Sequence, residues 1–256
     1  MRRLTDPRAG DVAVAERLLG QAAADGIAKL PVLSAAELWV LCGDQQVLAD
    51  EAEVQWWTAK SQIDREKYAT AMVDFLIHRQ LVRRPDDPGS TKLPMTAELA
   101  VIVAARQLPA VVVVCTKAGG VADQAPRMYG LAETGQSPRA VVSEVIFPPK
   151  EEAFGPMHHF SLVSPERAGK ILATWAAAQE KTGFLSRKPK ASLRVIDVYH
   201  HRSGEDLTRD RLEVDAAGAA LKLTRQRVGG EPEMRLQLST DELTSLVTGL
   251  LLEPAA

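Results

Sequence analysis

Hydrophobic positions in the first half of the chain recur every three or four residues, with polar positions between them. This spacing is typical of helices that bury one face. The segment "PDDPGS" interrupts the pattern at 85–90, and "KLPM" after it is predicted to be a short extended link. We expect helices over 10–24, from Ser34, over 45–63, from Asp64, and from Thr96 to about Gln107.

The second half has a different rhythm, in which short runs of apolar and β-branched residues are separated by turn residues. Such runs predict β-strands. Residues 118–139 show neither period and are predicted to be irregular, whereas Gly229 and Gly230 predict the turn of a hairpin. The strands are expected in "AVVVVCTK", "AVVSEVIF", "HHFSLV", "ASLRVIDVYHH", "LTRDRLEVD", "AALKLTRQRV" and "EMRLQLS".

One device recurs along the chain: an extended apolar segment, a capping Ser or Thr, and then an amphipathic helix. It begins at Ser34, Thr96, Ser164 and Ser239, and hydroxyl side chains are favoured at helix N-termini. One interpretation is a duplication whose halves meet near residue 135; the other is that strand followed by capped helix is a common unit.

These elements predict an α+β fold of mixed helices and largely antiparallel sheet. Residues 1–135 form a helix-rich half with a winged-helix-like segment, and residues 136–256 form an antiparallel-sheet half with capped helices. Under the duplication interpretation, two similar halves share a central sheet.

Composition narrows the possible classes of protein. The chain has 256 residues, 46% of them hydrophobic and 25% charged, with a formal charge of −2. This is typical of a soluble globular protein and gives little net attraction for phosphates. Cys42 and Cys115 lie far apart in the sequence and are expected to be reduced, and the longest apolar run, 110–115, is too short to cross a bilayer. We therefore expect a cytoplasmic protein without a membrane segment.

The common signatures of catalysis are missing from the sequence. It contains no GxxxxGK, GxGxxG, GxSxG or HExxH motif, so we expect a protein that is not an enzyme and has no cofactor. The pairs His158–His159 and His200–His201 are the nearest approach to a metal site. Adjacent strand residues point to opposite faces, and no carboxylate or thiol stands beside these histidines at ligand spacing. Hydrogen-bonded or surface histidines, with no metal, are the preferred interpretation.

Residues 34–99 resemble the winged helix-turn-helix of MarR-like regulators. The segment "LSAAELWVLC" matches the lead helix, "DREKYATAMVDFLIHRQLVRR" the recognition helix, and "PDDPGSTK" the wing. The resemblance implies DNA binding. However, Lys60 to Lys92 carry seven basic and five acidic residues, and carboxylates on a groove-facing surface repel phosphates. A DNA-binding transcriptional regulator is therefore the alternative hypothesis.

Over residues 30–252 the order of elements is similar to that of the EspG family, the cytosolic chaperones of type VII (ESX) secretion. An early "AELWVL" helix, a long helix ending "LIHRQLV", a strand-rich middle and a final hairpin before "LSTDELTSLVTGLLLEP" carry the resemblance. It implies two related α+β halves around a central sheet, and a non-catalytic chaperone or adaptor that binds a helical secretion substrate.

Partner-binding candidates follow from side-chain chemistry, because large aromatic and Arg side chains dominate protein contacts. Trp39 lies among apolar residues and is expected in the core, whereas a helix can bury two adjacent tryptophans only under a wide surface. The alternative for each candidate is an ordinary solvated or core position. The candidates are Trp56, Trp57, Arg225, Arg227, Met234 and Arg235.

Overall fold

Hydroxyl side chains begin four helices at the positions that the sequence predicts. Ser34, Thr96, Ser164 and Ser239 each have extended backbone and accept a hydrogen bond from the backbone N–H three residues later. Each cap satisfies an N–H group that lacks a partner within the helix and contributes about 1 kcal/mol. Ser61 forms a fifth cap of this kind, so the predicted helix over 45–63 was wrong in extent.

The computed structural model describes residues 8–22, 26–49, 51–84, 94–117, 125–148, 154–178, 193–200, 208–216, 220–227 and 234–254. Its helices are α1 (Arg8–Gly20), α2 (Ala35–Cys42), the 3-10 turn η1 (Gly43–Gln45), α3 (Glu51–Thr58), α4 (Gln62–His78), α5 (Ala97–Gln107), α6 (Pro165–Ala177) and α7 (Thr240–Leu252). Its strands are β1 (Ile27–Lys29), β2 (Leu33–Ser34), β3 (Val111–Lys117), β4 (Arg127–Leu131), β5 (Ala140–Phe147), β6 (Met157–Val163), β7 (Leu193–His200), β8 (Thr208–Asp215), β9 (Leu221–Arg227) and β10 (Met234–Leu238).

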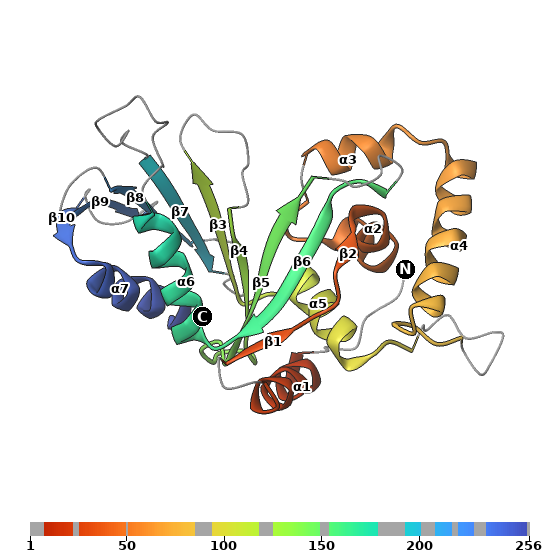
Figure 1. Ribbon diagram of the computed structural model, residues 1–256, viewed down its shortest axis with the longest axis horizontal. Coiled ribbons are helices and arrows are strands. Elements are labelled where there is room, and N and C mark those ends of the chain that lie inside the picture. Colours follow the sequence, from red (N-terminus) through yellow and green to blue (C-terminus); the bar gives the residue numbers. More distant parts are fainter. Residues whose placement is uncertain are drawn as a thin grey trace, which may run out of the picture.

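The ten described strands form one sheet in the order β1-β6-β5-β4-β3-β7-β8-β9-β10, and β2 pairs with β6 beside β1. Every described pairing is antiparallel. The α+β class and the antiparallel sheet are therefore confirmed. In Figure 1, α6 and α7 lie on one side of the sheet, and α2, α3 and α4 lie on the other.

Strand β4 corrects the prediction that residues 118–139 are irregular. It lies between β3 and β5, and Gly130 allows it to approach β3 closely. A Cβ atom at Gly130 would lie 2.3 Å from Cγ1 of Val111, a contact that only glycine avoids. The apolar period of "RMYGL" was too short to be recognised, because the strand is only five residues long.

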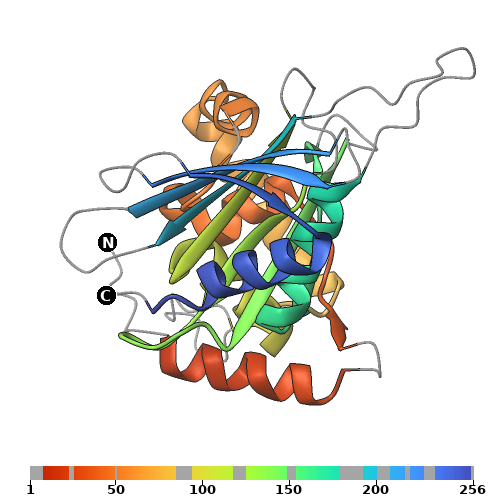
Figure 2. The same ribbon diagram turned by 90° about the vertical axis from the view of Figure 1, so that its left-hand side faces the viewer.

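Successive residues of β3 show how the sheet divides the hydrophobic core. Val111 and Val113 face the cluster under α6 and α7, whereas Val112 faces the cluster with α1, α2 and α5. A strand buried on both faces reads as a continuous apolar run, which explains "AVVVVC". Figure 2 shows α6 and α7 lying together across one face of the strands.

Strands β8 and β9 are covered by helices on one face only, whereas β3 is buried on both faces. Their buried residues, such as Leu212, Val214 and Leu223, face α6 and α7. The alternate residues Arg211 and Lys222 are half-buried or exposed, as expected for an antiparallel sheet with one solvated face. We call the solvated side of β8, β9 and β10 the open face; its side chains include Arg209, Arg211, Glu213, Lys222, Thr224, Arg235 and Gln237.

Residue 135, where the two predicted halves meet, lies in the connection between the paired strands β4 and β5. Strands β3 and β4 of the first half lie between β5 and β7 of the second half. The two halves therefore contribute interleaved strands to one sheet. Their similarity to each other stays a prediction.

Candidate functional site

Aromatic side chains connect the buried Trp39 of α2 to the surface of α3 and α4. Trp39 is buried, as predicted, and the ring of Trp57 stacks on it with centroids 5.8 Å apart and an interplanar angle of 8°. Trp56 meets Tyr68 of α4 edge-on at 5.9 Å. Nζ of Lys60 lies 4.3 Å from the Trp56 centroid and 4.5 Å from that of Tyr68, a cation–π arrangement.

The aromatic surface continues along α4. Phe75 lies seven residues after Tyr68 and therefore on the same side of the helix, about 10 Å further along its axis. Its ring stacks on Phe154 with centroids 6.4 Å apart. We call Trp56, Tyr68, Phe75 and Phe154 the aromatic row; Phe75 is 45% exposed and the other three are half-buried.

Exposed apolar side chains are frequent in the sequence range that includes α3 and α4. Among the described residues, six large hydrophobic side chains are exposed, and four belong to residues 47–95. Ile63 at the start of α4 is the most exposed of them, at 65%. A local excess of exposed apolar side chains is a feature of binding surfaces.

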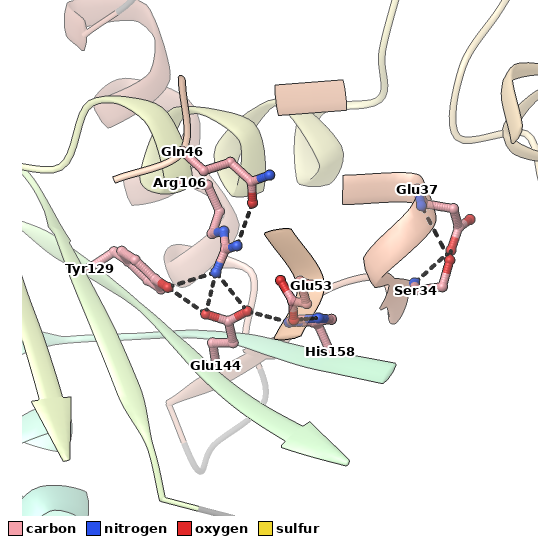
Figure 3. A network of polar contacts seen from close by, with 8 residues as sticks. All are labelled: Ser34, Glu37, Gln46, Glu53, Arg106, Tyr129, Glu144 and His158. Carbon is pink, nitrogen blue, oxygen red and sulfur yellow. Dashed lines mark hydrogen bonds and ion pairs between the residues drawn. The ribbon is translucent and has the colours of Figure 1, made fainter. Parts of the chain in front are cut away.

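A buried polar network connects α3 to strands of the sheet (Figure 3). Nη1 of Arg106 on α5 donates to both carboxylate oxygens of Glu144 on β5, at 3.1 and 3.0 Å. The hydroxyl of Tyr129 on β4 donates to Glu144 at 2.5 Å. Nδ1 of His158 on β6 lies 2.6 Å from Glu144, and its Nε2 lies 3.0 Å from Oε1 of Glu53 on α3.

The charges in this network determine its titration. Burial alone would raise the pKa of Glu144, but the guanidinium of Arg106 and the hydrogen bond from His158 lower it to about 2. Burial opposes protonation of His158, but its hydrogen bond with Glu144 and the nearby carboxylate of Glu53 raise its pKa above 6.5. Arg106 and a protonated His158 then balance two carboxylates, and buried charges are tolerated when they are paired in this way.

The burial of the network favours a positioning role over a chemical one. The side chains of Arg106, Glu144 and His158 have no exposed area, and that of Glu53 is 1% exposed. A pocket of about 440 Å³ lies elsewhere, along β7–β10, where Glu213, Lys222 and Arg235 are among its lining residues. An acid or base must reach its substrate to act; these groups instead fix α3.

A second ionic contact joins α4 to α2. The carboxylate of Glu37 completes the capping box with Ser34 and accepts a hydrogen bond from Nη1 of Arg79 at 2.5 Å. Nη2 of Arg79 donates to the carbonyl of Val32 at 2.7 Å. Arg79, the C-cap of α4, is therefore held by the N-terminus of α2.

The predicted partner-binding residues lie on two separate surfaces. Trp56 and Trp57 belong to α3, whereas the other four belong to β9 and β10 at the opposite end of the sheet (Figure 1). Arg225 and Arg227 point toward the interior of the protein, where both donate hydrogen bonds to the carboxylate of Asp210. This carboxylate has no exposed side-chain area. Met234 is 46% exposed.

The structure corrects the prediction that no carboxylate lies close to the paired histidines. His158 and His200 lie on β6 and β7, which are separated by β5, β4 and β3. Each nevertheless has nearby carboxylates that sequence spacing did not predict: Glu144 and Glu53 near His158, and Asp210 and Glu253 near His200. His201 lies outside the described residues.

The group of His200, Asp210 and Glu253 has ligand atoms within 4.8 Å of one another. Its surroundings fit a cation poorly. Arg225 donates to one oxygen of Asp210 and Arg227 to the other, and Arg227 also donates to Glu253 at 3.0 Å. Two guanidinium groups already neutralise the carboxylates that a metal ion would need.

Comparison with known proteins gives no family assignment. No protein-family model matches the chain, and a search of the curated proteins finds no match. Within the described ranges, every helix is too short or too polar to span a membrane.

Proposed function

We propose that this chain is a non-catalytic protein that binds a helical partner, as an EspG-like chaperone or adaptor does. The observation that carries the proposal is the aromatic row along α4. Residues spaced by seven on a helix form a stripe two turns long, and helical partners are recognised through anchors with the same repeat. Covering the partner's apolar stripe would keep it soluble, and a helical secretion substrate is the partner that the EspG resemblance implies.

The electrostatics of the same region support a protein partner over DNA. Arg79 is bound to buried Glu37, and Lys60 lies over two rings. These basic groups have contacts within the chain that compete with binding to phosphates. Phosphate contacts supply most of the affinity of DNA-binding proteins.

A winged-helix regulator stays the alternative because one observation favours it. Val82 and Met95 form an antiparallel bridge, the pairing expected at the base of a wing; residues 85–93, which would form its tip, lie outside the described residues. This alternative predicts binding to duplex DNA that weakens steeply from low to moderate salt. Titration of a labelled duplex at two salt concentrations tests it.

The main test is co-purification from the native host followed by reconstitution. The tagged wild type should retain a protein partner, whereas Trp56→Ala and Phe75→Ala should retain much less of it. With the purified partner, calorimetry should give about tenfold or greater loss of affinity for Phe75→Ala, as for an interface hot spot. Leu193→Ala is the matched control, because Leu193 is 37% exposed on a distant strand.

Two outcomes count against the proposal. Equal partner affinity for the wild type, Trp56→Ala and Phe75→Ala would remove the aromatic row as the binding surface. Recovery of DNA fragments without any protein would favour the regulator instead. Circular dichroism of each variant shows whether a loss of binding comes from unfolding.

A further inference from the structure

The two edges of the sheet are constructed differently. The outer edge of β6 is paired with β1 and β2, which are three and two residues long. At the other end, β10 pairs with β9 on one side, and no described strand pairs with its other side. A free edge presents backbone N–H and C=O groups that can pair with another strand.

The sequence of β10 does little to block such pairing. Native edge strands are usually protected by several charges, by proline or by a bulge. Strand β10 is "MRLQL", with one charged residue and no proline. Met234, Leu236 and Leu238 alternate along the side that faces α7, and Arg235 and Gln237 lie on the open face.

A two-fold axis perpendicular to the sheet places side chains of one face opposite side chains of the same face. Such an axis must therefore lie between the two β10 strands at the level of one residue and its copy, because neighbouring residues point to opposite faces. An axis at Arg235 would place two arginines opposite each other, which is unfavourable. An axis at Leu236 pairs all five residues without placing like charges opposite each other. Met234 then faces Leu238, Arg235 faces Gln237, and Leu236 faces its own copy.

We propose that β10 is the interface of a homodimer in which two copies pair antiparallel about Leu236. The two sheets then continue into one, and the exposed side chain of Met234 packs beside Leu238 of the second copy. This inference is independent of the proposed function, because α3 and α4, which carry Trp56, Tyr68 and Phe75, lie at the other end of the sheet from β10 (Figure 1).

The axis creates a charge test at Gln237, which is exposed. Gln237→Arg places like charges opposite each other at two symmetric positions, whereas Gln237→Glu places a carboxylate opposite Arg235 at both. With cross-strand pair energies of this kind, the dimer Kd should rise about 2- to 30-fold for Gln237→Arg and fall by a similar factor for Gln237→Glu. The double variant Arg235→Glu/Gln237→Arg exchanges the charges and should also dimerise more tightly than the wild type.

Sedimentation equilibrium over a range of protein concentrations measures each Kd, and circular dichroism confirms that each variant is folded. A wild type and a Gln237→Glu variant that both stay monomeric at high concentration would overturn the proposal, and would leave β10 as an edge for a different chain. A dimer whose Kd is unchanged by both charge variants would also overturn it, because the interface would then lie elsewhere.

Discussion

Two ionic clusters in this molecule contain similar groups in different surroundings. The inner cluster comprises Arg106, Glu144, His158 and Glu53, whose side chains are at most 1% exposed. The outer cluster comprises Asp210, Arg225, Arg227 and Glu253. Asp210 is fully buried, but the other three side chains are 26%, 37% and 40% exposed.

The comparison shows how exposure decides what an ionic cluster contributes. In the inner cluster every charge depends on the others, since water cannot replace a lost partner. In the outer cluster only Asp210 depends on its partners, and Arg225 and Arg227 duplicate each other. We therefore expect the inner cluster to be sensitive to single substitutions and to pH, and the outer cluster to tolerate the loss of either arginine.

The largest effect is expected for Arg106→Met. The substitution leaves the carboxylate of Glu144 buried without its guanidinium partner, which costs about 3–5 kcal/mol of unfolding free energy. Urea unfolding measures the loss. The double variant Arg106→Met/Glu144→Gln should recover part of it because the amide is neutral. A loss below about 1 kcal/mol for Arg106→Met would contradict the assignment of an interdependent inner cluster.

The outer cluster should break only when both arginines are removed. Arg225→Ala and Arg227→Ala should each cost about 1 kcal/mol, and the double variant about 3 kcal/mol, because Asp210 is then buried without a partner. A double-mutant cycle from urea unfolding gives the coupling directly. Strict additivity of the two single losses would show that the arginines do not substitute for each other.

The next largest effect is expected in the pH dependence of stability, to which His158 of the inner cluster contributes. The pKa of His158 is raised above 6.5 in the folded state, so its pairing stabilises the protein fully below that value. Above pH 6.5 the unfolding free energy should fall, by at most about 1.4 kcal/mol per pH unit, until pH passes the folded pKa. His158→Gln should lack this slope, and an identical profile in the variant would argue against a charged His158.

At acidic pH, the lowered pKa of Glu144 predicts that the unfolding free energy rises with pH, the opposite of the trend expected for His158. Its ionised form stabilises the fold above 4.5, and this contribution is lost as pH falls toward about 2. Glu144→Gln, although less stable at neutral pH, should therefore show a shallower loss of stability between these values. Acid unfolding followed by circular dichroism provides the measurement.

The smallest effect is expected for an exposed pair that belongs to neither cluster. Arg139 and Glu16 approach to 3.3 Å, but their side chains are 52% and 43% exposed. Arg139→Ala should change the unfolding free energy by less than about 0.5 kcal/mol, because exposed ion pairs contribute little. A loss comparable to that of Arg106→Met would mean that exposure is not the deciding variable.

The sequence predicted the local features of the fold well, because capping and periodicity are local. The caps at Ser34 and Ser239 were recognised from residues three positions apart, and both capping boxes are present. The strand at Gly130 was missed because it is only five residues long, and because the reason for its glycine is a contact with Val111, nineteen residues earlier.

The site was predictable only in part, for the same reason. Trp56 and Trp57 were recognised by residue type, but their continuation to Phe75 and Phe154 depends on how α4 packs. The inner cluster joins residues from α3, α5, β5 and β6. Neither spacing nor composition indicates that Arg106 will meet Glu144, 38 residues away; the register of the sheet decides it.

The interleaved strand order has a consequence for synthesis. Strands β3 and β4 leave the ribosome early, but β3 must pair with β7, whose residues are made about eighty positions later. Until then the apolar run "VVVVC" has β4 as its only paired strand among the described ones, so the edge of β3 that later pairs with β7 stays open. Folding that requires contacts between distant segments is slow and leaves apolar strands unpaired and prone to aggregation. We therefore expect this protein to depend on ribosome-associated chaperones during its synthesis.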